Sequence, residues 1–182
     1  MNDPMTSMQA RVEAYLARHD WSGVPGMAGR PFQVALLARG EYNLNYLVSA
    51  GDRKVVFRVN MGTQIGRDDQ IQYEFATLAL LADSGVTPVP YHVDDSRTFF
   101  DQGIGIMAYL PGRALDYATD REAAARLLAT VHQVPVPADH HLIREEAPLG
   151  LIYQECAQLL ETYFGSPLAD PAIRTFLQEV LA

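Results

Sequence analysis

The sequence predicts an α+β fold in which all the strands lie in the first part of the chain and only helices follow them. Three short apolar segments, residues 32–38, 44–49 and 54–60, are separated by the turn-forming sequences RGEYN and AGD. Apolar residues alternate in the second and third segments, as expected for strands with one buried face. A helix and two further strands come next, and the rest of the pattern is helical. Sequential strands with short connections favour an antiparallel meander.

Residues 8–19 are expected to form an amphipathic helix ahead of the sheet. Its apolar stripe consists of Met8, Val12, Tyr15 and Leu16. Charged side chains interrupt the run, which argues against a signal peptide. The breaker-rich sequence GVPGMAGRP then connects this helix to the first strand.

A second helix is expected after the third strand, in the sequence DDQIQYEFATLALLADSG. Asp68 or Asp69 can cap its start, and Gly85 is placed to end it. A short fourth strand follows Pro90, and a fifth strand covers residues 104–110. The fifth strand is nearly all apolar, which predicts that both of its faces are covered.

Only helical patterns follow the fifth strand. Thr119 and Glu122 have the spacing of a capping box at the start of the third helix. Two further helices are expected over residues 150–164 and 170–182. The single cysteine, Cys156, lies in the first of these two and is expected to be a buried structural thiol.

The bulk composition argues against several classes of protein. The chain has 182 residues, of which 48% are hydrophobic, and a net charge of −8. No run of Lys or Arg exceeds two residues, so a nucleic-acid partner is not expected. No apolar stretch approaches the length of a membrane span, so no membrane partner is expected either. A single cysteine permits no intrachain disulfide, and we therefore expect a cytoplasmic protein.

Two charged residues stand among apolar neighbours and need an explanation. Arg58 leaves the third strand on the side away from Val55, Phe57 and Val59. Glu74 falls inside the apolar stripe of the next helix, where an unpaired charge is costly. Each could simply reach solvent, Arg58 from an exposed sheet face and Glu74 by snorkelling from the edge of the stripe. If the helix packs on that sheet face, the two side chains can instead form an ion pair, with nitrogen and oxygen within about 4 Å.

Five segments occur in order over residues 36–132: ARGEYNLNYLV, KVVFRVN, YEFATLALLADSGVTPVP, IMAYLPGRALDY and LLATVH. In these segments the sequence resembles the aminoglycoside phosphotransferase and choline-kinase-like superfamily, whose fold is protein-kinase-like. The resemblance implies a nucleotide-binding N-lobe over residues 1–110, with a five-stranded antiparallel sheet and a packed helix. Residues 111–182 would then be the linker and the first helices of an incomplete, all-helical C-lobe.

The same resemblance implies a nucleotide site. Its members would come from the first turn, the third strand, the following helix and the end of the fifth strand: Gly40, Asn43, Arg58, Glu74, Met107, Ala108 and Leu110. The first turn would cover the phosphates, and the arginine, held by the glutamate, would contact phosphate oxygens. Adenine would bind the backbone of the alanine and the leucine, in front of the methionine. The implied cofactor is ATP or another nucleoside triphosphate with magnesium, and the implied substrate is a small hydroxyl-bearing molecule. A P-loop is not an alternative, because no GxxxxGK[ST] sequence occurs.

The catalytic loop of that superfamily, HxDxxxxN, is not recognised in the sequence. His92-Val93-Asp94 begins correctly, but Phe99 stands at the asparagine position, and the segment falls between the fourth and fifth strands. No asparagine follows Asn60, and we find no second metal-binding aspartate. We therefore expect no catalytic and no metal-binding residue in this chain.

Three hypotheses remain open. The chain can be the nucleotide-binding part of a phosphotransferase, a fragment that is inactive alone, because it stops in a helical pattern before any catalytic loop. It can be a non-catalytic nucleotide-binding or regulatory module. It can also be an α+β interaction domain in which the pair formed by Arg58 and Glu74 is purely structural. Nucleotide binding separates the third hypothesis from the other two.

Overall fold

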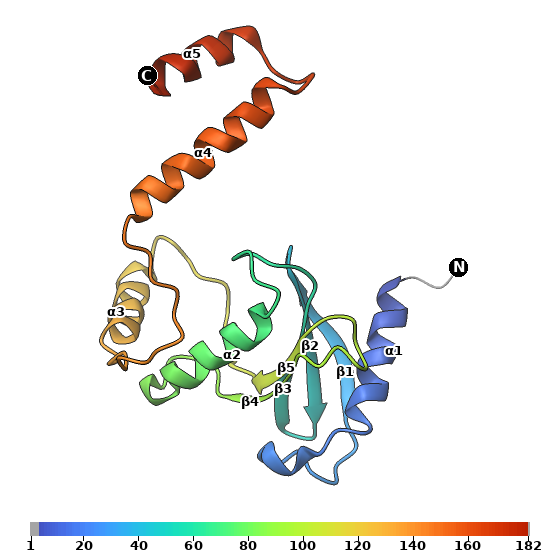
Figure 1. Cartoon of the computed structure of the whole chain (residues 1–182). Helices are drawn as coiled ribbons and strands as arrows, with labels where there is room; N and C mark the ends of the chain where they lie inside the picture. Colours follow the sequence, from blue (N-terminus) through green and yellow to red (C-terminus); the bar gives the residue numbers. More distant parts are fainter. Residues whose placement is uncertain (1–3, 182) are drawn as a thin grey trace. The chain divides into compact units, whose positions relative to one another are not determined.

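The computed structural model describes residues 4–181 (Figure 1). The chain divides into two compact units, Met1–Leu142 and Ile143–Ala182. The described strands and the helices α1 (Pro4–Leu16), α2 (Gln70–Leu81) and α3 (Arg121–His132) belong to the first unit. The second unit holds α4 (Pro148–Phe164) and α5 (Pro171–Leu181).

The first unit is built on one five-stranded antiparallel sheet with the strand order β1-β2-β3-β5-β4. Its strands are β1 (Gln33–Arg39), β2 (Asn43–Ala50), β3 (Arg53–Asn60), β4 (Pro90–Asp94) and β5 (Ile104–Ala108). The first three form a meander because tight turns join them, and at the β2–β3 turn Gly51 has a left-handed φ of 58°. The sheet and its packed helices confirm the predicted α+β fold.

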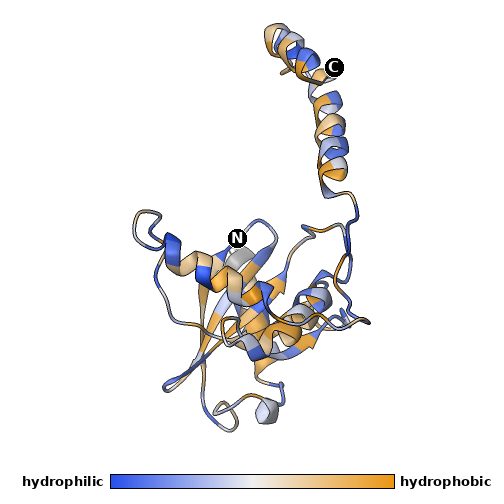
Figure 2. Ribbon diagram, turned by 90° about the vertical axis from the view of Figure 1, so that its left-hand side faces the viewer, coloured by the Kyte–Doolittle hydropathy of each residue, from blue (hydrophilic) through white to orange (hydrophobic). Residues whose placement is uncertain are grey.

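Helix α1 covers one face of the sheet. Its residues Val12 and Leu16 are fully buried and share a core with Tyr46, Phe57 and Ile106 from three different strands. The helix begins and ends earlier than the sequence predicts, although the predicted apolar stripe is the face that packs. Figure 2 shows apolar residues along the strands of the sheet.

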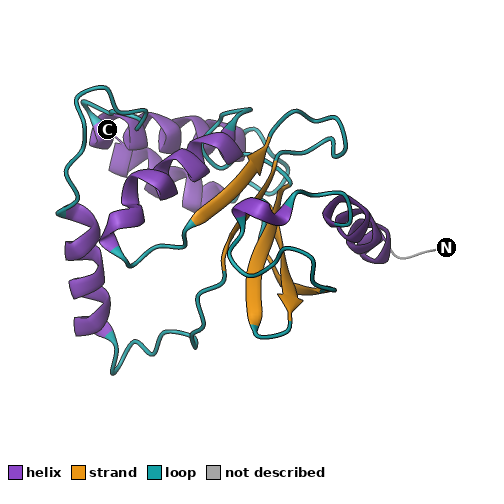
Figure 3. Cartoon of the chain, turned by 90° about the horizontal axis from the view of Figure 1, so that it is seen from below, coloured by secondary structure: helices purple, strands orange, loops and turns teal. Residues whose placement is uncertain are grey.

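Helix α2 covers the opposite face, as Figure 3 shows from below the sheet. Its buried residues Ile71 and Phe75 pack on Met107 of β5, with Val56 of β3 at the margin. Since Ile106 points into the α1 core and Met107 into the α2 core, β5 is covered on both faces, as its apolar sequence predicts.

The close approach of α2 to the sheet depends on a glycine in β5. A Cβ atom built on Gly105 would lie 2.9 Å from Cε1 of Phe75 and closer still to Cζ and Cε2. Any other residue would therefore push the helix away from the strand. Gly105 is also the register partner of Arg58 on β3, so this contact sets the height of α2 above Arg58.

Several local predictions need correction. The predicted capping box is wrong, because α3 starts one residue later with Asp120 as its N-cap and no capping bond from a side chain. The Asp120 carboxylate instead accepts hydrogen bonds from the Arg113 guanidinium and the Asp116 amide. At the start of α2, Asp69 is the N-cap residue but also makes no capping bond, since its carboxylate pairs with Arg67.

The second unit consists of two amphipathic helices, and Figure 2 shows both polar and apolar residues along α4 and α5. Cys156 of α4 is exposed, so the predicted buried thiol is wrong. The error arose because a helical pattern places a residue on a face without showing what covers that face. No helix within residues 4–181 has both the length and the hydropathy that a membrane crossing requires.

Candidate functional site

The predicted ion pair between Arg58 and Glu74 is confirmed. Arg58 leaves β3 on the α2 face of the sheet, and its Nη1 atom lies 2.6 Å from Oε2 of Glu74. The two side chains are 27% and 23% exposed. Partial burial reduces solvent screening, and a carboxylate within hydrogen-bond distance keeps the guanidinium in one orientation.

A second strand also holds the guanidinium. Asn45 is the register partner of Arg58 on β2, and its Oδ1 accepts a hydrogen bond from Arg58 Nε at 3.0 Å. Two different edges of the guanidinium are therefore fixed, one by the strand and one by the helix. We did not predict the role of Asn45. The sequence feature that could have indicated this role is the alternation of β2. Once β2 is paired with β3, that alternation places Asn45 on the same face of the sheet as Arg58.

The other oxygen of Glu74 is bound one turn earlier on α2. Gln70 is buried, with 2% exposure, and its Nε2 donates to Glu74 Oε1 at 2.9 Å. The Gln70 Oε1 atom accepts backbone amides of the preceding loop, from Gln64 at 2.6 Å and from Ile65 at 3.4 Å. Sequence reasoning missed Gln70 as well, although it lies four residues before Glu74 and so shares its side of the helix.

The turn between β1 and β2 is tied to the end of β3. Within the turn, the Gly40 amide donates to the Asn43 carbonyl at 2.8 Å. The side chain of Asn60 donates to Asn43 Oδ1 at 3.1 Å, and the Met61 amide donates to the Tyr42 carbonyl at 2.7 Å. The turn thus lies beside the end of β3 that follows Arg58. A Cβ on Gly40 would meet only the Asn43 carbonyl oxygen at 3.7 Å, so packing alone does not demand glycine there.

The other predicted residues lie at the opposite end of β3, where β5 ends. Met107 is buried against α2, and Ala108 is the register partner of Val55. The Ala108 amide donates to the Val89 carbonyl at 2.8 Å, so this N–H is already used within the sheet. Leu110 follows the last residue of the strand by two positions and is 53% exposed.

The incomplete HxD motif lies on the other face of the sheet from Arg58. It falls within β4, not between the fourth and fifth strands, because this strand runs from Pro90 to Asp94. The Tyr15 hydroxyl of α1 donates to Asp94 Oδ2 at 3.1 Å and lies 3.0 Å from His92 Nε2. Burial raises the pKa of the Tyr15 hydroxyl, and the neighbouring Asp94 carboxylate adds to this effect, so the hydroxyl remains a donor.

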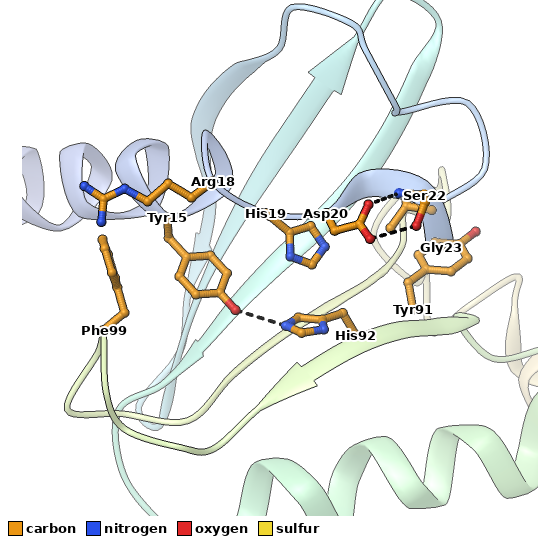
Figure 4. A pocket seen from close by; sticks show the side chains of 10 residues that line it. Tyr15, Arg18, His19, Asp20, Ser22, Gly23, Tyr91, His92 and Phe99 are labelled. Carbon is orange, nitrogen blue, oxygen red and sulfur yellow. Dashed lines mark hydrogen bonds between the residues drawn. The ribbon is translucent and has the colours of Figure 1, made fainter.

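A cavity of about 550 Å³ opens on this α1 face (Figure 4). It is lined by Tyr15, Arg18, His19, Asp20, Ser22, Gly23, Val24, Tyr91, His92 and Phe99. Figure 4 shows the Tyr15 hydroxyl directed toward His92, with His19 beside them. Burial lowers the pKa of both histidines, so both rings are neutral near pH 7. None of the predicted nucleotide-binding residues lines this cavity.

Comparison with known proteins identifies a family for this chain. Residues 33–182 match the model of the phosphotransferase enzyme family. A search of curated proteins finds no match.

Solved structures with similar folds are also found. A spectinomycin phosphotransferase solved with ADP and spectinomycin has a TM-score of 0.50 and 13% identity, over 81% of this chain and 47% of that one. A candidate fructosamine-3-kinase from Haemophilus somnus 129PT has a TM-score of 0.42 and 16% identity, over 71% and 39% of the two chains. A candidate aminoglycoside phosphotransferase from Ralstonia eutropha JMP134 has a TM-score of 0.42 and 22% identity, over 59% and 29%.

The chain spans less than half the length of each of these solved proteins. At such identities the likeness to the spectinomycin phosphotransferase concerns the fold alone, which is the protein-kinase-like α+β fold. The family match rests on the sequence, and it extends from the first strand to the end of the chain. The chain therefore belongs to the phosphotransferase enzyme family.

Proposed function

We propose that this chain contributes the nucleotide-binding part of an ATP-dependent phosphotransferase that acts on a hydroxyl group of a small molecule. The observation that carries the proposal is the Arg58–Glu74 ion pair of 2.6 Å, on the α2 face of a sheet of this family. A cation that is already oriented can bind phosphate oxygens without reorganising, and positioning accounts for most of the catalysis in phosphoryl transfer.

The proposed site follows β3 from one end to the other. The backbone at the end of β5, at Ala108 and Leu110, takes adenine, and Met107 forms the back of the pocket. The turn with Gly40 lies at the far end, next to the phosphates. Arg58 is three residues along β3 from the register partner of Ala108, roughly 10 Å at the rise of an extended strand. This spacing supports a ligand whose apolar and anionic ends are well separated, as in a nucleoside triphosphate.

The Ala108 amide is bonded to Val89, so the alanine serves through its carbonyl and the donor is the Leu110 amide. Asn43 is the second member of the phosphate-covering turn, and its side chain is already held by Asn60. A nucleotide also fits the relative solved with ADP, although that structure covers this chain only at the level of the fold. We keep a lobe boundary after residue 110 as part of this proposal.

Magnesium accompanies the nucleotide in this family, and we assign none of the residues of the proposed site to it. Within residues 4–181, no three His, Cys, Asp or Glu side chains gather as metal ligands. We assign no step to the metal, and no general base is assigned because the HxDxxxxN loop is not recognised in the sequence. We propose no residue of this chain for acceptor binding or for the transfer step, and residues 1–182 alone are proposed to be inactive.

The proposal is tested by comparing ATP with adenosine in calorimetric titrations of the full chain. With no metal ligand assigned, we expect dissociation constants between about 100 μM and 1 mM, which is roughly 4–5.5 kcal/mol. Arg58→Ala should weaken ATP about tenfold and leave adenosine almost unchanged, because only ATP contacts the cation. Arg58→Lys should weaken ATP less, since a point charge still meets phosphate although the two-edged geometry is lost.

The two alternatives predict different titrations. An interaction domain with a purely structural ion pair binds neither ligand at millimolar concentration. A non-catalytic nucleotide-binding module should give the same titrations as the proposed enzyme part, with ATP weakened selectively in Arg58→Ala. The titrations therefore do not separate these two hypotheses, and the length of the natural reading frame does.

A further inference from the structure

We propose that Gln70 is a positioning residue of the nucleotide site, which links the loop of residues 61–69 to the guanidinium of Arg58 through Glu74. The proposal rests on the function proposed above. Gln70 is a polar side chain in the core of the first unit, with 2% exposure, whereas the two charged residues that it serves are each about a quarter exposed. In this hydrogen-bond network, the fully buried residue is therefore the uncharged Gln70, and the two charged residues keep partial contact with solvent.

An amide side chain is the group that this position requires. One end must donate, because it faces Glu74 Oε1 at 2.9 Å. The other end must accept, because it faces the amides of Gln64 and Ile65 at 2.6 and 3.4 Å. Glutamine supplies both in one side chain, whereas a carboxylate cannot donate and an apolar residue can do neither. Because position 70 is buried, a donor or acceptor left there without a hydrogen-bond partner would lower the stability of the fold.

The consequence for Arg58 follows from the two oxygens of Glu74. Oε2 is bound to Arg58 and Oε1 is bound to Gln70, so the plane of the carboxylate is fixed from both sides. Without the Gln70 bond, a side chain that is 23% exposed can rotate toward water and release the guanidinium. Asn45 alone would then hold Arg58, by one edge. Gln70 thereby makes the orientation of the phosphate-binding cation depend on the conformation of the loop before α2.

The experiment uses Gln70→Glu and Gln70→Leu in the full chain. Gln70→Glu keeps the oxygen that accepts the loop amides but places a second carboxylate against Glu74. Gln70→Leu removes both interactions. Gln72→Glu and Gln72→Leu are matched controls, because Gln72 is the same residue type, two positions along the same helix, and exposed.

The first measurement is the NMR signal of the Arg58 Nε–Hε group in the protein without ligand. In the wild type we expect one sharp, slowly exchanging signal, and in both Gln70 variants a signal that is shifted and exchanges faster with water. The second measurement is the affinity for ATP and for adenosine. ATP should bind at least about threefold more weakly to the Gln70 variants, with adenosine unchanged, because only the oriented cation is lost.

A pH series separates positioning from general damage to the fold. The charged groups that face position 70 are Glu74 on α2 and, through it, Arg58 on β3. When the pH is lowered from 8 to 5.5, protonation of the carboxyl group introduced in Gln70→Glu gives it an O–H that can donate to Glu74 and restore the missing bond. Relative to wild type at the same pH, ATP affinity should recover in Gln70→Glu and not in Gln70→Leu.

The inference is overturned if the Gln70 variants keep the wild-type Arg58 signal and ATP affinity, or if the Gln72 controls behave as the Gln70 variants do. Equal loss of ATP and adenosine in Gln70→Glu, with no recovery at low pH, also overturns it in favour of a merely structural role. Failure of the proposed function looks different, since Arg58→Ala would then leave ATP binding unchanged. The Arg58 signal of the ligand-free protein tests Gln70 in either case.

Discussion

Replacing Gly105 by alanine should move α2 away from the sheet and loosen the Arg58 site without touching either charged residue. The added Cβ would come within 2.9 Å of Phe75 Cε1 and nearer still to two other ring atoms. Carbon atoms in contact prefer a separation of about 3.5–4.0 Å, so the ring must move by more than about 1 Å. It cannot do so freely, because Phe75 is only 4% exposed and packs in one buried cluster with Ile71 and Met107.

The magnitude follows from two opposing effects. Overpacking of a well-packed core costs about 1–3 kcal/mol. The lower entropy of the unfolded chain after replacing a glycine returns about 0.4–1 kcal/mol where the backbone geometry suits alanine. Gly105→Ala should therefore destabilise the first unit by about 1–2 kcal/mol, measured as a lower urea midpoint at unchanged slope. The Arg58 Nε–Hε signal should shift at the same time, since Arg58 is the register partner of Gly105.

Gly112→Ala is the matched control, because a Cβ at that position meets no atom within 4 Å, and it should change stability by less than about 0.5 kcal/mol. Phe75→Leu should relieve the clash in the Gly105→Ala background. The two substitutions should then be non-additive, with a coupling of about 1 kcal/mol in the favourable direction. If Gly105→Ala is as stable as the wild type and keeps its Arg58 signal, our account of how β5 positions α2 is wrong.

Three further predictions concern the charged groups and the activity. A double-mutant cycle with Arg58→Ala and Glu74→Ala should give a coupling of about 1 kcal/mol, toward the upper end of the range for partly exposed pairs, and additivity within error would refute a stabilising pair. Burial lowers the pKa of His19 and His92 below 6.5, so near pH 6 the unfolded chain binds more protons than the folded one. Stability should therefore rise with pH up to about 6.5 in denaturation experiments and level off above it, with a shallower slope in His92→Gln; a stability that falls over this interval contradicts the burial of neutral rings. Finally, the full chain should show no phosphate transfer from ATP to small hydroxyl compounds in a coupled assay, and turnover that persists through purification would reveal a general base that we have not identified.

The ion pair was predictable because two periodicities fix the directions of its members. Alternation along β3 puts Arg58 on the face of the sheet away from Phe57, and the helical period puts Glu74 on the same side of its helix as Ile71 and Leu78. Once the helix packs on the strand, few other partners are available to either charge. The observed pair of 2.6 Å is the result of that packing.

The residues that hold the pair were less predictable. Asn45 meets Arg58 only through the register of β2 on β3, and register depends on the turn between the strands as well as on the pattern within each. Gln70 looks like a solvated residue at the start of a helix, and its burial follows from the path of the preceding loop. The error at Thr119 has a similar origin, because the neighbouring Asp120 is bound by Arg113 from outside the helix.

The central claim, that the α2 face of this sheet binds a nucleotide, is tested most directly by mapping amide chemical shifts of the full chain during a titration with ATP. The account predicts that the largest changes follow the proposed site, at Gly40, at Arg58 and from Met107 to Leu110. The cavity of about 550 Å³ described above lies on the other face, next to His19 and Tyr15. Changes confined to that cavity, or no change at millimolar ATP, would contradict the claim.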